Sequence, residues 1–125
     1  LRGGKAAPFR YCGRVRFQVD VAERVALACN CSICFKKSFQ HVIVPRARFR
    51  LERGAGVLST YRFNTGVARH TFCRHCGVQS FYTPRSHPEG VSVNLRCLDD
   101  RAVIASFEVR PFDGDNWEAN VADIQ

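Results

Sequence analysis

The sequence predicts a mainly β protein that folds as one domain, and three observations support this. Short runs in which apolar and polar residues alternate dominate the chain, a pattern typical of half-buried strands. Turn residues separate these runs, as at Gly54–Gly56 and Asn64–Gly66. A length of 125 residues suits a single domain, which we place at residues 1–125 with a core at about 9–123.

The clearest strand is the run 14–21, where Val15, Phe17 and Val19 alternate with polar residues. Further strands are predicted at Arg24–Ala28, His41–Val44, Arg48–Glu52, Val57–Phe63, Val67–Phe72, Gln79–Thr83, Val91–Cys97 and Val103–Val109. Only the tail, Asn116–Ile124, is predicted to be a helix, short and C-terminal, with Asp115 as its N-cap. Large aromatic residues, Phe35 and Trp117 among them, are expected in the core.

Charge and hydropathy limit the function classes. The net charge is +8, but the basic residues are scattered, and a solvated strand face explains Arg46, Arg48, Arg50 and Arg53 better than a phosphate-binding stripe. A nucleic-acid partner is therefore disfavoured without being excluded. No apolar stretch approaches the roughly eighteen residues of a membrane helix, so no membrane partner is expected. No export leader opens the chain, which begins at Leu1 and lacks methionine; we expect a trimmed or partial product located in the cytoplasm, with the nucleus as alternative.

Three cysteines within six residues, Cys29, Cys31 and Cys34, carry the strongest chemical signal. Clustered thiolates select zinc or an iron–sulfur centre over harder metals. Three close ligands also leave a fourth position for an exchangeable group, as in catalytic zinc sites. Disulfides are the weaker interpretation, because seven cysteines cannot all pair and partners this close rarely reach the required geometry.

A second pair, Cys73 and Cys76, precedes Gly77 and has the spacing of a zinc knuckle. The glycine permits a positive φ that turns backbone N–H groups towards the sulfurs. A redox pair is the alternative, but the βαβ context of such a site is absent.

Asn30 and Ser32 alternate with the first three cysteines and are either donors to the ligands or turn formers. Among the histidines, His70 and His75 are expected to be solvent-facing or satisfied strand residues, and His41 and His87 show no partner.

Four segments together resemble the glutathione-dependent formaldehyde-activating enzyme family, which also contains centromere protein V. They are Cys12–Phe17, Cys29–Cys34, Phe72–Phe81 and Asp113–Trp117, and they occur in the family's order and spacing. The resemblance implies an Mss4-like β fold with two zinc–sulfur centres. It implies that Cys29, Cys31 and Cys34 hold the catalytic zinc, and that Cys12, Cys73 and Cys76 belong to a structural zinc site.

One position departs from the family pattern. Arg10 stands where the structural site should have another cysteine, and a guanidinium has no lone pair to offer a metal. Three outcomes are open for that zinc: three protein ligands and a water, recruitment of Cys97, or loss of the metal. A buried thiol on a strand is the simpler interpretation of Cys97.

The leading functional hypothesis is a carbon–sulfur lyase of the kind that the family name implies, adding a thiol such as glutathione to a small aldehyde such as formaldehyde. Lys36 and Lys37, directly after Cys34, are the predicted contacts for the carboxylates of the thiol. The alternative is a non-catalytic, zinc-stabilised binding module of the centromere protein V kind, with a basic surface for chromatin or another anionic partner. An iron–sulfur electron carrier is a third option, recognisable by its brown colour.

Restoring the missing cysteine tests the interpretation of Arg10. We expect Arg10→Cys to raise zinc affinity and melting temperature, because a fourth thiolate completes the structural site, while chemistry at Cys29, Cys31 and Cys34 changes little. Zinc titration and thermal unfolding measure both effects. Unchanged values would mean that Cys97 already completes the site or that no structural zinc exists. Only the first of these predicts further metal loss in Cys97→Ser.

Overall fold

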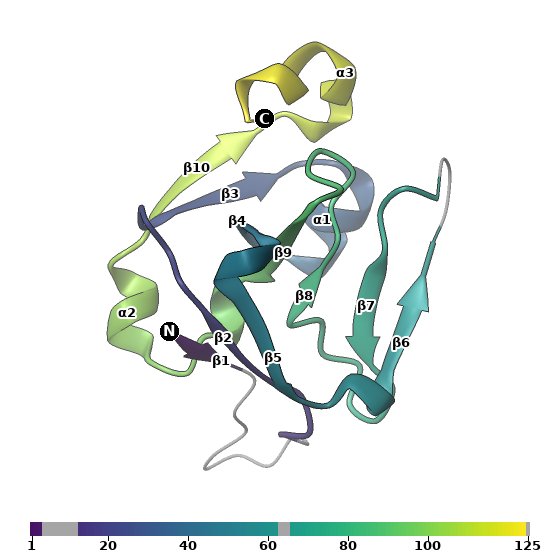
Figure 1. Ribbon diagram of the computed structural model, residues 1–125. Helices are drawn as coiled ribbons and strands as arrows, with labels where there is room; N and C mark the ends of the chain where they lie inside the picture. Colours follow the sequence, from purple (N-terminus) through teal and green to yellow (C-terminus); the bar gives the residue numbers. More distant parts are fainter. Residues whose placement is uncertain (4–12, 63–65, 125) are drawn as a thin grey trace.

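The computed structural model describes residues 1–3, 13–62 and 66–124 and shows a small β domain (Figure 1). The described strands, in chain order, are β1 (Arg2–Gly3), β2 (Arg16–Val19), β3 (Val25–Cys29), β4 (Gln40–Pro45), β5 (Phe49–Arg53), β6 (Leu58–Tyr61), β7 (His70–Cys73), β8 (Phe81–Tyr82), β9 (Gly90–Asn94) and β10 (Glu108–Phe112). A mainly β fold is therefore confirmed.

The strands form a five-stranded sheet, a three-stranded sheet and a hairpin. The large sheet has the order β10-β3-β4-β9-β8, and the three-stranded sheet has the order β1-β2-β5. Strands β6 and β7 pair only with each other among the described residues, and in Figure 1 their hairpin projects on the right. All named pairings are antiparallel except that of β10 with β3, which is parallel.

The core lies on one face of the large sheet and follows from strand periodicity. Side chains alternate between the two faces of a strand, so Val42 and Val44 of β4 point to the same side as Val91 and Val93 of β9. These residues are buried, and Phe17 of β2 packs into the same cluster with none of its surface exposed. The remaining buried members are Val19, Ala26, Leu95, Leu98 and Phe107.

The opposite face of the large sheet carries polar and sulfur-bearing residues. In the β3–β4 register Leu27 lies opposite His41, and in the β8–β9 register Tyr82 lies opposite Ser92. Residues directly opposite each other in an antiparallel pair share a face. Cys29 follows Leu27 by two positions and therefore shares its face too. The sheet thus separates a hydrophobic core from a second surface on which a site can be built.

Three short helices complete the described chain: α1 (Ser32–Lys37), α2 (Arg101–Ala105) and α3 (Trp117–Asn120). Single 3₁₀ turns occur at Arg46–Arg48, Ala55–Val57, Leu95–Cys97, Gly114–Asn116 and Val121–Asp123. The short C-terminal helix is confirmed. It is split, however, because α3 lies between two 3₁₀ turns and its N-cap is Asn116 rather than Asp115. No helix within the described residues has the length and apolar character needed to span a bilayer.

The structure corrects several other expectations. Residues 103–105, predicted as strand, belong to α2, because the Asp100 side chain accepts a hydrogen bond of 2.8 Å from the Ala102 amide and so caps a helix. Helix α1, within the cysteine motif, was not predicted. Phe35 lies on α1 with 73% of its surface exposed, so its placement in the core is wrong.

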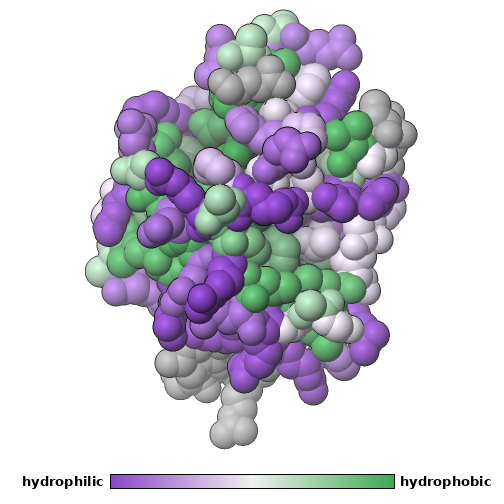
Figure 2. All heavy atoms as spheres, in the orientation of Figure 1, coloured by the Kyte–Doolittle hydropathy of each residue, from purple (hydrophilic) through white to green (hydrophobic). Residues whose placement is uncertain are grey.

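The basic residues are spread over the surface. Arg46, Arg48, Arg50 and Arg53 are all exposed, as expected, but they do not form one strand face, because Arg46 and Arg48 lie in a 3₁₀ turn and only Arg50 and Arg53 lie on β5. Figure 2 shows hydrophilic side chains scattered over the visible face, interrupted by hydrophobic ones rather than gathered into one region.

Candidate metal centre

The sulfurs of Cys29, Cys31 and Cys34 converge on one point, where all three Sγ atoms lie within 4.8 Å of one another. Cys29 is the last residue of β3, and Cys31 is the N-cap of α1, with extended backbone angles (φ −60°, ψ 155°). Cys34 lies in the first turn of α1 and is buried. Residues three apart on a helical turn project to the same side, which brings the sulfurs of Cys31 and Cys34 together.

Helix α1 is short because its ends are fixed by the surrounding chain. The Phe35 amide donates to the Cys31 carbonyl at 2.9 Å, which closes the first turn. Ser38 adopts the left-handed conformation at the other end (φ 55°), and its amide donates to the Phe35 carbonyl at 3.2 Å. The chain then enters β4. The strands β3 and β4, which flank α1, hold the cysteines at the end of the strands, where β3 stops and β4 begins.

The three thiols share charge unequally. The pKa of Cys31 is lowered to about 2, because the thiols of Cys29 and then Cys34 donate hydrogen bonds to its sulfur. The pKa of Cys34 is raised well above its usual range, since its thiol proton is held by Cys29 and Cys31 and the group is buried. The pKa of Cys29 is also raised, mainly by its hydrogen bond to Cys31. All three can ionise together only if a cation joins them.

This donor set fits a soft or borderline divalent cation. Three thiolates around one point are the ligands that zinc prefers, and no carboxylate or histidine belongs to the group within the described part of the chain. A bound cation would replace the protons that the three sulfurs share and would stabilise all three as thiolates. The group therefore could hold a metal ion, with Cys29, Cys31 and Cys34 as its protein ligands.

Gly114 lies in close contact with Cys29 and Cys31. A Cβ built on this residue would overlap the Cys29 Sγ and would lie 3.1 Å from the Cys31 Cβ. Asn30 holds the glycine there: its Nδ2 donates to Asp113 Oδ1 at 3.0 Å, and its Oδ1 accepts from the Asp115 amide at 3.0 Å. The Asn30 amide also donates to the Phe112 carbonyl at 3.2 Å. Asn30 thus links the cysteine motif to the C-terminal loop, and both polar atoms of its side chain hydrogen-bond to that loop.

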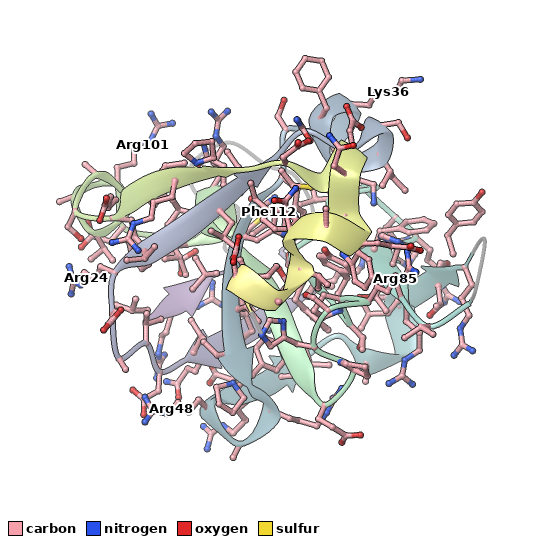
Figure 3. All side chains as sticks on the ribbon, turned by 90° about the horizontal axis from the view of Figure 1, so that it is seen from above. Arg24, Lys36, Arg48, Arg85, Arg101 and Phe112 are labelled. Carbon is pink, nitrogen blue, oxygen red and sulfur yellow. The ribbon has the colours of Figure 1, made fainter. Side chains whose placement is uncertain are left out.

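A cavity of about 320 Å³ opens beside the sulfurs, on the face of the sheet opposite the core. Its floor is made by strand residues, including Leu27, His41 and Ile43. The C-terminal segment forms another wall through Phe112, Gly114 and other residues. The remaining C-terminal lining residues are Asp115, Trp117 and Ile124. In Figure 3, Phe112 lies near the centre of the molecule, beneath the C-terminal coil. A pocket of this size next to three thiols suits a small-molecule substrate.

Buried polar and aromatic groups form the floor next to Cys34. His41 Nδ1 lies 3.0 Å from Ser92 Oγ and 3.2 Å from Tyr82 Oη. The ring of His70 stacks on Tyr82 at a centroid distance of 4.9 Å, and Phe39 meets Tyr82 edge-on at 5.2 Å. Burial lowers the pKa of both His41 and His70 to about 4, so both imidazoles are neutral.

Three cations lie in or near the cavity wall, and their distances from it differ. Lys37 Nζ donates to Gln79 Oε1 at 2.8 Å and lies 3.3 Å from Nδ1 of His70, a cavity-lining residue; burial lowers its pKa. Lys36 is exposed and points away from the body of the protein (Figure 3). Neither lysine lines the cavity, whereas Arg85 does, with its guanidinium 3.8 Å from the centre of the Trp117 ring.

The second cysteine pair occupies a tight turn. The Gly77 amide donates to the Cys73 carbonyl at 2.8 Å with φ +77°, the positive value that the knuckle pattern requires. Cys73 is buried and Cys76 is exposed. Arg10 and Cys12 lie outside the described residues, so their part in a structural zinc site stays a prediction.

Cys97 behaves as a neutral thiol. Its sulfur lies 3.7 Å from the Gln79 carbonyl oxygen, and burial raises its pKa to about 11, with the nearby Cys76 adding to the effect. The simpler interpretation was a buried thiol on a strand; the thiol is partly buried, but it lies in the 3₁₀ turn Leu95–Cys97, because β9 ends at Asn94.

Sequence reasoning identified the three cysteines but missed most of the cavity. Gly114 and Arg85 were not selected, although Asp113–Trp117 contributed to the family resemblance. The two histidines of the floor, His41 and His70, were left without a role. Their only signal was a polar residue within an apolar strand, which is common and weak.

The site and fold define a class of protein: a small β domain with a three-thiol, metal-competent centre beside a substrate-sized cavity. The family model "Glutathione-dependent formaldehyde-activating enzyme" matches residues 10–111. This chain belongs to that family. A crystal structure of a Rhodobacter sphaeroides protein is similar in fold, with a TM-score of 0.72 and 28% sequence identity over 88% of this chain and 100% of the other. The predicted Mss4-like β fold agrees with both comparisons.

Adding a methyl group at Gly114 tests its contact with the Cys29 sulfur. We expect Gly114→Ala to lower zinc affinity by about tenfold to a hundredfold, because its methyl group displaces the Cys29 sulfur. Competition with a chromogenic chelator measures the affinity. Gly56→Ala is the matched control, since a Cβ there meets no atom within 4 Å. Equal zinc affinity in the two variants would contradict the contact.

Proposed function

We propose that this protein is a zinc-dependent carbon–sulfur lyase that adds the thiol of glutathione, or a similar thiol, to formaldehyde or another small aldehyde. The observation that carries the proposal is the convergence of the Cys29, Cys31 and Cys34 sulfurs at the wall of a cavity of about 320 Å³. The family to which the chain belongs supports the choice of thiol and aldehyde.

When bound by the three cysteines, zinc would accept a thiol as fourth ligand and lower its pKa, which supplies the nucleophile. The remaining changes are the formation of the carbon–sulfur bond and the transfer of one proton. Carbon–sulfur bond formation moves the π electrons of the C=O group to oxygen, and this oxygen takes up a proton in place of the one that the thiol released. The product is a hydroxymethyl thioether, and the reverse reaction releases the aldehyde.

The apolar walls and the nearby cations have separate roles in the proposal. Phe112, Trp117 and Ile124 limit access of water to the reacting atoms from the C-terminal side. Arg85 is the cation best placed for a carboxylate of the thiol, because it lines the cavity and its ion pair with Glu118 is long, at 3.8 Å. Lys37 and Lys36 remain proposed contacts at increasing distance from the cavity.

The function is tested by measuring adduct exchange. NMR exchange spectroscopy on glutathione and formaldehyde reports how fast the hydroxymethyl adduct forms and dissociates. We expect the zinc-loaded protein to accelerate both directions above the spontaneous rate. Cys31→Ser should lose about one equivalent of zinc and this acceleration together. Equal acceleration by Cys31→Ser would reject the proposal. Steeply salt-dependent DNA binding without any glutathione binding would instead favour the non-catalytic module.

The carboxylate contacts are tested by removing one positive charge at a time. We expect Arg85→Gln to raise the KM for glutathione by about tenfold, since a partly exposed charge-assisted hydrogen bond is lost. Lys37→Gln should have a smaller effect and Lys36→Gln the smallest, following their distance from the cavity. Arg101→Gln carries the same charge change on α2, remote from Arg85 in Figure 3, and is the control. An equal effect in the control would assign the change to overall charge.

A further inference from the structure

The floor of the cavity contains a buried histidine nitrogen that the protein itself does not use. His41 is 5% exposed, lines the cavity, and has no hydrogen-bond partner at Nε2. Among the described residues, the other buried side-chain nitrogen or oxygen without a hydrogen-bond partner is Gln79 Nε2. Gln79 does not line the cavity. A buried polar atom without a partner is costly, so it requires an explanation such as a ligand.

The groups that face the other ring nitrogen of His41 bear on whether Nε2 carries a proton. Two hydroxyl groups, Ser92 Oγ at 3.0 Å and Tyr82 Oη at 3.2 Å, face Nδ1. Burial raises the pKa of Tyr82 and keeps its hydroxyl protonated, and its hydrogen-bond partners are Ser92 and His41 Nδ1. When Tyr82 donates to Nδ1, the neutral imidazole carries its proton on Nε2. Nε2–H is then a donor without an acceptor beside the three sulfurs.

We propose that His41 Nε2–H binds the oxygen atom of the aldehyde and holds it while the thiol sulfur bonds to the neighbouring carbon. This inference rests on the proposed function and adds a substrate-binding residue to it. The hydrogen bond strengthens as the C=O electron pair moves to oxygen, so the donor favours the transition state over the ground state. The proton on Nε2 stays on the ring, and the oxygen takes its proton from water.

The same geometry predicts which substrates fit. The sulfurs and the imidazole act on adjacent atoms, sulfur on the carbon and Nε2–H on the oxygen. Phe39 and Tyr82 pack against the imidazole, with ring centroids 4.7 and 5.6 Å from its own, and His70 stacks on Tyr82. A carbonyl with one small substituent or none can approach this donor, and a ketone with two bulky substituents cannot.

Two substitutions of nearly equal size separate the donor from its structural role. Asn at position 41 places its amide near Nδ1 and keeps the contact with Ser92, but it leaves nothing at Nε2. Gln at position 41 reaches the Nε2 position with an N–H donor. We expect His41→Asn to lower kcat/KM for adduct formation by about a hundredfold and His41→Gln to retain most of it. Zinc content and the dissociation constant for glutathione alone should stay within twofold of the wild-type values in both variants.

A second measurement does not depend on turnover. In zinc-loaded, ¹⁵N-histidine-labelled protein, the chemical shift of His41 Nε2 reports whether this nitrogen is protonated. We expect a protonated Nε2 whose resonance moves when formaldehyde is added to the glutathione complex, and not when glutathione is added alone. His41→Asn identifies the resonance by its absence.

The possible results separate the two proposals. Wild-type acceleration with equal activity in both His41 variants, or an unprotonated Nε2, would overturn the role of His41 and leave the proposed function intact. Loss of one zinc equivalent in His41→Asn would also overturn it, since His41 would then be a metal ligand. Absence of acceleration and of glutathione binding in the wild-type protein would reject the proposed function itself, and the role of His41 with it.

Discussion

The two-residue periodicity of the five-stranded sheet is the constraint on which the site depends. Val42 and Val44 are buried in the core only if His41 and Ile43 project from the other face of the same strand. The same rule assigns Val91 and Val93 to the core and Ser92 to the opposite face. A shift of one residue in this register would expose the valines and bury the histidine in hydrocarbon. The hydrophobic core therefore fixes the position of the polar floor.

The cysteine motif adds a second constraint, which is electrostatic. Three thiols within 4.8 Å cannot all lose their protons without a cation, and the opposite pKa shifts of Cys31 and Cys34 express that conflict. Lys37 lies close enough that the charges of Cys34 and Cys31 partly offset the lowering of its pKa by burial. The neutral imidazoles below contribute no positive charge to offset the thiolates. The site is thus arranged for a divalent cation and not for a charged histidine.

Much of the fold could be predicted from local patterns, and the exceptions have physical causes. Alternation located most strands within two or three residues. It failed at 103–105, where Val103 and Ile104 resemble a strand but the Asp100 cap starts a helix. It also missed α1, because a six-residue helix has too few turns to show a period of 3.6. Its exposed Phe35 could not be recognised for the same reason.

The candidate site was predictable only in part. Three cysteines in one short segment carry their own spacing, so Cys29, Cys31 and Cys34 could be assigned together. His41, Tyr82 and Ser92 come from three strands and meet only through the sheet register, which a single sequence does not reveal. The contact between Gly114 and the cysteine motif could not be predicted, because it depends on the hydrogen bonds by which Asn30 holds the C-terminal loop. Lys36 and Lys37 were chosen by nearness in sequence, whereas Arg85 reaches the cavity from a distant segment.

The C-terminal wall of the cavity includes residues of Asp113–Trp117, one of the four segments that resemble the family. The match ends at residue 111, and the cavity wall opposite the strand floor begins at Phe112 and continues through Gly114, Trp117 and Ile124. The sulfurs and the strand floor lie within the matched range, while this wall lies beyond it. Asn30 joins the two parts, since its hydrogen bonds to Asp113 and Asp115 bring the wall against the cysteines. The position of the C-terminal wall relative to the sulfurs, and with it the size of the cavity beside them, therefore depends on Asn30.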